Sequence, residues 1–492
     1  MAEKGTPEQI RESGFVFRGK GVCLDDRQSW GERIGFQMQT KQVDFSKGSV
    51  TQNIIRVAAP MLVAQILNLM YNIVDRIYIG RIPGEGLLAL GGVGLCFPFI
   101  SLITAFTNLY GAGGAPLCSI ERGRGNTEEA EKIMNTSFCL LVLTGGLLTL
   151  FGSVFCRPVL VLFGASDSSL PYALPYMRIY LFGAVFSMVA LGMNPFINSQ
   201  GFANVGMTTI FLGAVTNIIL DPLFIFVLGF GIQGAAWATV CSQALSAVFV
   251  MRFLMSGKAE LRLWLNRKPQ LLKRHVLDII GLGSASFVMQ CTNSLVQIAC
   301  NRMLGTFGGD VYVSTMTIIH SVRQILDTPV MAIADGASPI LSFNYGAKRY
   351  DAVKKAIRFV TWTALVYTTA VWALVLLLPE MFIGIFNRDS SLLEVAVPAL
   401  HIYFFAFLFQ ALQYSGQTVF KSLNKKKQAI FFSLLRKAVI VVPLTFLLPY
   451  VGGLGAMGVF AAEPVSNFLG GSACFLAMVF TTLPELKGKQ PE

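Results

Sequence analysis

The sequence predicts an all-α membrane protein with twelve transmembrane helices in two pseudo-symmetric six-helix lobes. Its composition is 54% apolar with only 13% charged residues, which is typical of a chain that lies mostly in lipid. The apolar residues gather in runs of about 20 residues or more, which are long enough to cross a bilayer as helices. Features of the first half also recur in the second half at a nearly constant separation.

The formal net charge is +12, and the position of that charge argues against nucleic acid as a partner. Basic residues lie in short segments between apolar runs, and no basic helix with interleaved aromatic residues stands apart from the membrane. The nine cysteines are scattered without metal-ligand spacing, and no hydrolase, metalloprotease or nucleotide-binding motif is present. We therefore expect no enzyme activity and no cofactor, with the lipid bilayer as the main surroundings.

Residues 1–50 are polar and mixed in charge, without the apolar core of a signal peptide, and we expect a disordered cytoplasmic tail. The first lobe spans residues 51–255. Its first helix carries Asn68, Tyr71, Asn72 and Asp75 at three- and four-residue steps, which places a polar stripe on one face, suited to a bundle interior. The six predicted helices are 54–79, 87–117, 134–155, 172–198, 211–230 and 232–255.

A basic linker is predicted over residues 256–275, where cationic residues alternate with Leu261, Leu263 and Trp264. This pattern suits an amphipathic segment on the membrane surface, and a solvated loop is the alternative. The second lobe spans residues 276–483, and residues 484–492 form a short tail. Its predicted helices are 279–304, 312–341, 352–378, 395–420, 430–450 and 456–483.

The two lobes also resemble each other in sequence. The separation between Pro116 and Pro339 recurs unchanged in the pairs Gly123/Gly346 and Tyr180/Tyr403. The segment Asp167–Leu170 recurs as Asp389–Leu392, a single position out of that register. A series of such matches indicates a parallel repeat of about six helices, as expected for a two-lobed transporter.

The loops predict the orientation of the chain. Those after the second, sixth, eighth and tenth helices are basic, whereas the alternate loops are short, nearly uncharged or balanced by acids. Because basic loops remain on the cytoplasmic side, both termini and all four basic loops are expected to be cytoplasmic.

The fifth helix carries a polar pair inside an apolar run. Asn217 and Asp221 are four residues apart and share a helical face, and Pro222 removes a backbone hydrogen bond from the preceding turn. A carboxylate in a membrane span costs about 2.5–3.5 kcal/mol on insertion scales, so it usually faces a cavity or a partner. A helix that merely tolerates a polar kink is the alternative.

The predicted topology places further polar groups at the same depth. Asp75 lies ~8 Å from the outer end of its helix and Asp221 ~12 Å from the end of its own, with Thr239 nearly level. Arg76 points about 100° away from Asp75. Such a group can bind a hard cation through oxygen ligands, or hold a proton where burial and a like charge favour the neutral acid. Two independently satisfied acids are the alternative.

Four segments resemble the multidrug and toxic compound extrusion (MATE) transporters: Tyr71–Gly80, Asn217–Pro222, Gly234–Thr239 and Asn344–Ala347. The resemblance extends over nearly the whole chain from about Thr51. It is closest to the prokaryotic branch with its cation site in the N-terminal lobe. It implies an antiporter of the plasma (inner) membrane, expected as a monomer, that exports organic cationic and aromatic compounds by alternating access in exchange for H⁺ or Na⁺.

The resemblance also implies roles for single residues. Asp75, Asn217, Asp221 and Thr239 stand where that branch keeps its cation-coupling residues, with Na⁺ as the only metal they would hold. Pro60 stands at the proline where the first helix of that branch is proposed to bend as the site loads. We assign a supporting role to Tyr71, Asn68 and Asn72 of the polar stripe.

The second lobe departs from other MATE branches, which place essential acids on the seventh and tenth helices. Here the seventh helix offers Gln290 and Asn293, and the tenth has Glu394 only at its outer edge. The eighth helix instead carries His320, Arg323 and Asp327. Arg323 and Asp327 are four residues apart, so mutual neutralisation is favoured over a second coupling site.

Two rival functions can be compared with this reading. A lipid-linked sugar flippase should line its cavity with several cations for a pyrophosphate, and the predicted spans show few beyond Arg178, Arg302 and Arg323. An intramembrane enzyme lacks its required motifs. The first 37 residues have no apolar periodicity, so they are expected to be a dispensable tail or translation upstream of a start at Met38, with a regulatory or lipid-binding tail as the alternative.

Overall fold

The computed structural model describes residues 42–163, 165–264, 272–386 and 390–488, all in one compact unit. The predicted tail up to residue 41, the Met38 start, Asp389 of the repeated motif, part of the linker and the last four residues lie outside the described residues. The described part of the chain is helical, with turns and short loops between helices and no strand.

The first lobe follows the predicted order of six spans, with the fourth split into two helices. It comprises α1 (Val50–Gly80), α2 (Gly86–Gly123), α3 (Thr127–Leu162), α4 (Leu170–Phe182), α5 (Ala184–Ser199), α6 (Ala203–Pro222) with the π-helical turn η2 (Leu223–Val227), and α7 (Gly231–Met255).

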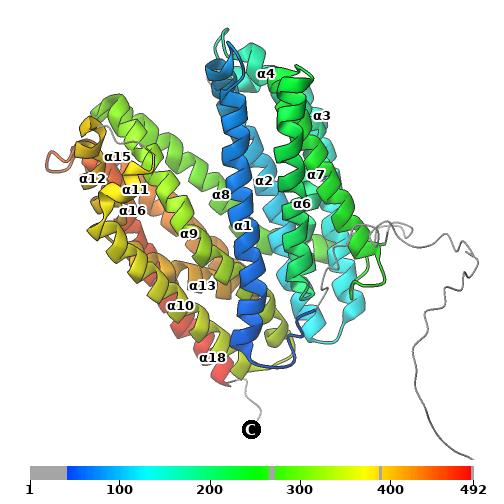
Figure 1. Cartoon of the computed structure of the whole chain (residues 1–492). Helices are drawn as coiled ribbons and strands as arrows, with labels where there is room; N and C mark the ends of the chain where they lie inside the picture. Colours follow the sequence, from blue (N-terminus) through cyan, green and yellow to red (C-terminus); the bar gives the residue numbers. More distant parts are fainter. Residues whose placement is uncertain (1–41, 164, 265–271, 387–389, 489–492) are drawn as a thin grey trace, which may run out of the picture. The chain divides into compact units, whose positions relative to one another are not determined.

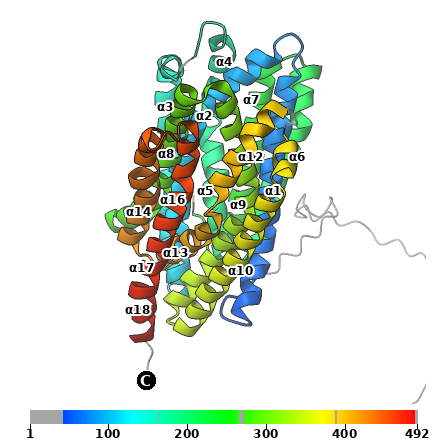
Figure 2. The same cartoon turned by 90° about the vertical axis from the view of Figure 1, so that its left-hand side faces the viewer.

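The second lobe repeats this plan with more breaks. It comprises α8 (Lys273–Phe307), α9 (Gly309–Gly346), α10 (Tyr350–Leu377), α11 (Pro379–Gly384), α12 (Ser390–Phe404), η3 (Phe407–Phe409), α13 (Gln410–Ser422), α14 (Lys426–Leu434), η4 (Leu435–Val441), α15 (Val442–Leu447), η5 (Leu448–Tyr450), α16 (Ala456–Ser466), η6 (Asn467–Gly471), α17 (Ser472–Ala477), η7 (Met478–Thr482) and α18 (Leu483–Gly488). Helices α9, α10, α12 and α13 pack against one another (Figure 2).

Twelve membrane-length segments account for the described chain, as predicted. Ten helical segments are long and apolar enough to cross a membrane, and the bent pair α4–α5 makes an eleventh. Helix α9 is the twelfth by length, with 38 residues, but it is more polar because it carries the group around Arg323. Helices α4 and α5 meet at 56°, a bend that their continuous apolar sequence did not predict.

The turns of the two lobes confirm the internal repeat. Gly229 and Gly231, the first residue of α7, have φ of 70° and 54°, and their counterparts Gly453 and Gly455 before α16 have φ of 74° and 52°. Glycine adopts these left-handed angles without steric cost. Lys348, with φ of 57°, stands at the repeat position of Gly125, whose φ is 82°. The second lobe thus keeps the turn but holds a lysine in a conformation that costs about 1–2 kcal/mol.

The linker packs on protein rather than on the membrane surface. Leu261 and Leu263 are buried in the core of the first lobe. The backbone N–H of Leu261 donates to the side-chain oxygen of Gln200 at 2.9 Å, and the N–H of Leu263 donates to the Leu254 carbonyl at 3.0 Å. Both the expected surface position and the solvated loop are therefore wrong for Leu261 and Leu263, because these side chains pack into the apolar core of the lobe.

Candidate functional site

Three helices of the first lobe bring the predicted coupling residues together. Helix α1 packs along α6, and α6 packs along α7 (Figure 1). The side-chain amide of Asn217 donates to Asp221 Oδ1 at 3.2 Å and to Thr239 Oγ1 at 3.5 Å. Asp221 is 0% and Asn217 1% exposed, so this polar pair lies between helices rather than against lipid.

The carboxyl groups of Asp75 and Asp221 lie within hydrogen-bonding reach of each other. Three buried oxygens of the group have no hydrogen-bond partner among the described residues: Asp75 Oδ1, Asp221 Oδ2 and Asn217 Oδ1. The guanidinium of Arg76 lies over the Phe97 ring, 4.8 Å from its centroid. No ion pair within the described chain engages either carboxyl group, so a shared proton or a hard cation on these oxygens is the fitting partner.

Aromatic side chains line the same region. Tyr71 on α1 and Tyr176 on α4 both interact electrostatically with Asp75. The rings of Tyr176 and Tyr180 stack with centroids 6.3 Å apart, and the Tyr180 hydroxyl interacts with the side chain of Gln243 of α7. Sequence reasoning missed Tyr176 and Gln243, and it identified Tyr180 only as one member of a repeated pair. Gln243 lies four residues after Thr239, so helical spacing could have found it.

The other first-helix predictions are placed differently. Asn68 and Asn72 have exposed side chains, and the amide of Asn72 donates to the Asn68 carbonyl at 2.6 Å. Asn68 and Asn72 therefore lie on an exposed face of α1, and no hydrogen bond among the described residues joins them to the carboxyl groups of Asp75 and Asp221. Pro60 is buried within α1, about four turns before Asp75, and the helix continues past it without interruption.

The predicted polar group of the second lobe belongs to a larger buried network. Arg323 of α9 donates to Asp327 Oδ2 at 3.2 Å, to the hydroxyl of Tyr403 at 2.7 Å and to Glu463. Gln410 of α13 connects Arg323 with Asp327, because its side-chain oxygen accepts from Arg323 at 3.1 Å and its side-chain nitrogen donates to Asp327 at 3.0 Å. The expected neutralisation of Asp327 by Arg323 is thus present, but it is one bond of several.

Glu463 of α16 is the second centre of this network. It accepts from Lys437 Nζ at 3.0 Å and from Arg436 Nη1 at 3.3 Å, both on the π-helical segment η4. His320 lies beside the network, with its ring 5.9 Å from that of Tyr403 and its Nε2 unpartnered among the described residues. Three cations and two carboxylates, each 9% exposed or less, therefore share one buried region.

Sequence reasoning missed Glu463, Arg436 and Lys437, and it undercounted the cations in the spans. The internal repeat could have pointed to Glu463. Glu463 follows Thr239 by the same number of residues as Gly458 follows Gly234, so the two pairs occupy equivalent positions in the two lobes. Each of these glycines lies against the chain ten residues before it, at Phe224 and at Leu448. The repeat therefore places Glu463 in the second lobe where Thr239 stands in the first.

Comparison with known proteins gives concordant matches. The MatE family model matches residues 60–223 and again residues 285–447, one copy in each lobe. The multidrug export protein MepA of Staphylococcus saprophyticus is 21% identical over 411 residues, covering 83% of this chain and 90% of MepA. The probable multidrug resistance protein YoeA of Bacillus subtilis is 23% identical over 430 residues, covering 86% and 92%. The fold also matches the outward-facing conformation of a multidrug resistance MATE family transporter, with a TM-score of 0.84 at 23% identity over 91% of this chain and 99% of that one.

Proposed function

The chain belongs to the MatE family of membrane transporters, and we propose that it exports organic compounds in exchange for H⁺ or Na⁺ held by Asp75 and Asp221. The related MepA and YoeA proteins are a multidrug export protein and a probable multidrug resistance protein, and they come from bacteria. A multi-pass protein of the plasma membrane, rather than an enzyme, follows from these relatives.

The observation that carries the coupling proposal is the contact between two carboxyl groups that have no cationic partner in the described chain. Two carboxylates in contact repel each other unless a proton or a cation lies between them. The carboxylate, amide and hydroxyl oxygens of this group are also the ligand types that hard cations accept. Loading and release of the ion would therefore change the net charge between α1 and α6. The electrostatic force between these two helices would then depend on the ion gradient.

Alternating access is supported by where the lobes touch. A Cβ added to Gly283 of α8 would lie 1.8 Å from the Leu109 carbonyl oxygen of α2, and one added to Gly346 would lie 2.0 Å from that of Ile120. Both contacts lie toward the helix ends that carry the basic loops, the side predicted to face the cytoplasm with both termini. Close packing there is what an outward-facing state requires, and it agrees with the fold match to an outward-facing transporter.

The substrate class follows from the lining of the site. Tyr71, Tyr176 and Tyr180 offer aromatic faces near two acids, which favours cationic aromatic compounds through ring and charge contacts. A flippase for pyrophosphate lipids is less suited, because Arg436 and Lys437 already bond to Glu463 within their own lobe. Each chain contains two lobes, so we propose that the monomer is sufficient.

Dye efflux from proteoliposomes tests the proposal, with a pH gradient and a Na⁺ gradient imposed separately. Wild-type protein should export under one of them, and Asp221→Asn should abolish gradient-driven efflux, since an amide carries neither the proton nor the charge. Asp75→Asn should act alike, and the double variant should be little worse than either single one. Asp167→Asn, in an exposed loop, is the control. Wild-type efflux by Asp221→Asn would remove this carboxyl from the mechanism, and no flux under either gradient would refute secondary transport.

A further inference from the structure

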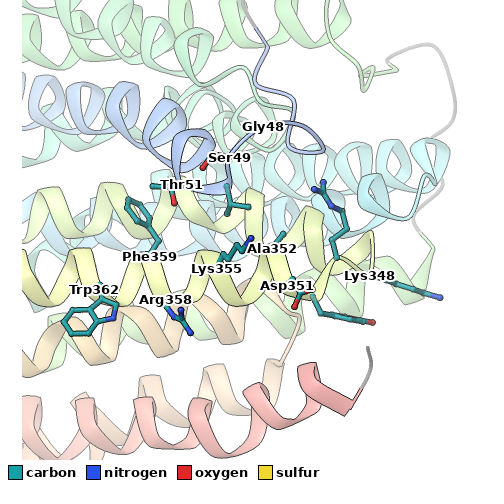
Figure 3. A pocket seen from close by; sticks show the side chains of 13 residues that line it. Gly48, Ser49, Thr51, Lys348, Asp351, Ala352, Lys355, Arg358, Phe359 and Trp362 are labelled. Carbon is teal, nitrogen blue, oxygen red and sulfur yellow. The ribbon is translucent and has the colours of Figure 1, made fainter. Parts of the chain in front are cut away.

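A basic pocket lies between the start of α1 and the start of α10, away from the coupling site. Its volume is about 1020 Å³, and Figure 3 shows the side chains that line it, among them Lys348, Lys355, Arg358, Phe359 and Trp362. Within the described chain no ion pair engages Lys348, Lys355 or Arg358, and all three side chains are exposed. The lining acid, Asp351, pairs with Lys354 at 3.7 Å.

The pocket lies beside the first turns of α10, a helix that is long and apolar enough to cross a membrane. Lys355, Arg358 and Trp362 follow one another at three- and four-residue steps, so they share one face of α10. The Trp362 side chain is 62% exposed, and its ring lies one turn further into the span than Arg358. Along α10 the two cations come first and the exposed tryptophan lies deeper in the span. In a membrane leaflet the phosphate groups likewise lie at the surface and the acyl chains lie deeper.

The internal repeat supplies a comparison within the same chain. Lys132 of α3 is the repeat equivalent of Lys355, but it pairs with Glu128 at 3.0 Å and with Glu129 at 3.7 Å. Where Arg358 and Trp362 stand in α10, the first lobe has Asn135 and Cys139.

The first lobe has an equivalent groove between α3 and α8, and an ion-pair contact crosses it. His275 Nε2 of α8 lies 2.7 Å from Glu129 Oε1, whereas the equivalent positions of α1 and α10 hold Gln52 and Ala352, which cannot form an ion pair. The repeat-equivalent lysine is thus neutralised by acids in the first lobe and, among the described residues, has no ion-pair partner in the second, where Arg349 Nη1 donates to the Ser46 carbonyl at 2.6 Å.

The turn that begins this pocket carries the lysine with a left-handed backbone. Lys348 occupies the position where the first lobe uses Gly125, and it lies at the edge of the pocket among its lining residues (Figure 3). A non-glycine residue is seldom kept in this conformation unless its side chain serves a purpose. The strain and the excess positive charge therefore occur at one place.

We propose that this pocket binds the phosphate headgroup of an anionic phospholipid of the cytoplasmic leaflet. Lys348, Lys355 and Arg358 would hold the phosphate, and Trp362 with Phe359 would lie along the first part of the acyl chains. The proposal rests on the orientation given by the basic loops and is independent of the transport mechanism. Such a lipid would join α1 to α10, one helix from each lobe.

Quenching of Trp362 by a brominated lipid tests this binding. The full-length protein is placed in phosphatidylcholine bicelles with rising fractions of brominated phosphatidylglycerol, and the Trp362 signal is the difference between wild type and Trp362→Phe. Wild type should saturate at low fractions of the anionic lipid. The double variant Lys355→Gln/Arg358→Gln should need about 25-fold more anionic lipid for half-maximal quenching, because each lost charge weakens binding about fivefold. Lys132→Gln, the repeat-equivalent change in α3, should leave the titration unchanged.

Other outcomes would overturn the proposal. Equal quenching of Trp362 by brominated phosphatidylcholine would show that the pocket does not select charge, and this comparison needs no substitution of a charged residue. Displacement of the brominated lipid by millimolar inorganic phosphate would assign the pocket to free phosphate instead. If Lys132→Gln weakened lipid binding as much as the double variant does, the binding would depend on the overall surface charge and not on this pocket.

Discussion

Removing the charge of Glu463 should destabilise the second lobe more than any single change of an exposed acid. Wild-type protein has three buried cations facing two carboxylates, and Glu463→Gln leaves three cations facing Asp327 alone. Removing one partner of a buried ion pair costs about 3–5 kcal/mol. If a lobe of about 200 residues unfolds as one unit at about 2–4 °C per kcal/mol, the melting temperature should fall by about 6–20 °C.

The cysteines of this lobe provide the assay. Cys300 and Cys474 are buried, and Cys300 Sγ lies 4.0 Å from the Thr445 hydroxyl, so a thiol-reactive dye labels them as the lobe opens. Heating the purified protein with this dye gives the transition directly. Glu394→Gln, at an exposed position of α12, is the matched control and should leave the transition where it is.

A second substitution tests whether charge is the cause. The wild-type network carries one excess positive charge, Glu463→Gln raises the excess to two, and adding Lys437→Met returns it to one. The double variant should therefore melt above Glu463→Gln, a non-additive result expected of residues in contact. A Glu463→Gln protein that melts within about 2 °C of wild type would refute the electrostatic role of the network.

Three further changes test the moving parts. Pro60→Ala should restore a backbone hydrogen bond in α1, so cation binding should survive while turnover falls, and unchanged turnover would argue against bending of this helix. Gly283→Ala should slow efflux at least tenfold because its Cβ meets the Leu109 carbonyl oxygen. Gly281→Ala, which meets only the flexible end of Lys426, should not, and equal rates in both would contradict close packing of the lobes. A chain that begins at Met38 should transport normally, and insertion without transport would show that the tail is required.

The existence of each span could be predicted from hydropathy, but its ends could not. Helix α3 begins at Thr127 rather than at 134, and α9 extends to Gly346 rather than to 341. An apolar window detects only the part of a helix that lies in lipid, whereas polar turns at the helix ends continue the same backbone hydrogen bonds. The bend between α4 and α5 was also hidden, because the break falls inside an apolar run.

The two polar clusters differed in how much of them the sequence could predict. Asn217 and Asp221 are four residues apart, so helix geometry alone pairs them, and topology adds Asp75 at the same depth. Glu463 bonds to Arg323 across 140 residues and to Lys437 across 26, on separate helices. A charge in an apolar span looks isolated until the helix that neutralises it is placed beside it.

In the proposed mechanism, the difference between the clusters also favours the first lobe as the one that couples an ion gradient. A coupling carboxyl must bind and release a proton or a cation during each cycle, so it cannot have a permanent counter-ion. Arginine does not lose its proton in proteins, and Asp327 and Glu463 both bond to Arg323, which fixes them as partners of a lasting cation. Asp75 and Asp221 interact with each other, and no ion pair engages either of them within the described chain. Substitution of the first-lobe acids should therefore remove coupling at unchanged stability, whereas substitution of Glu463 should lower stability first, and the thermal and efflux measurements separate the two.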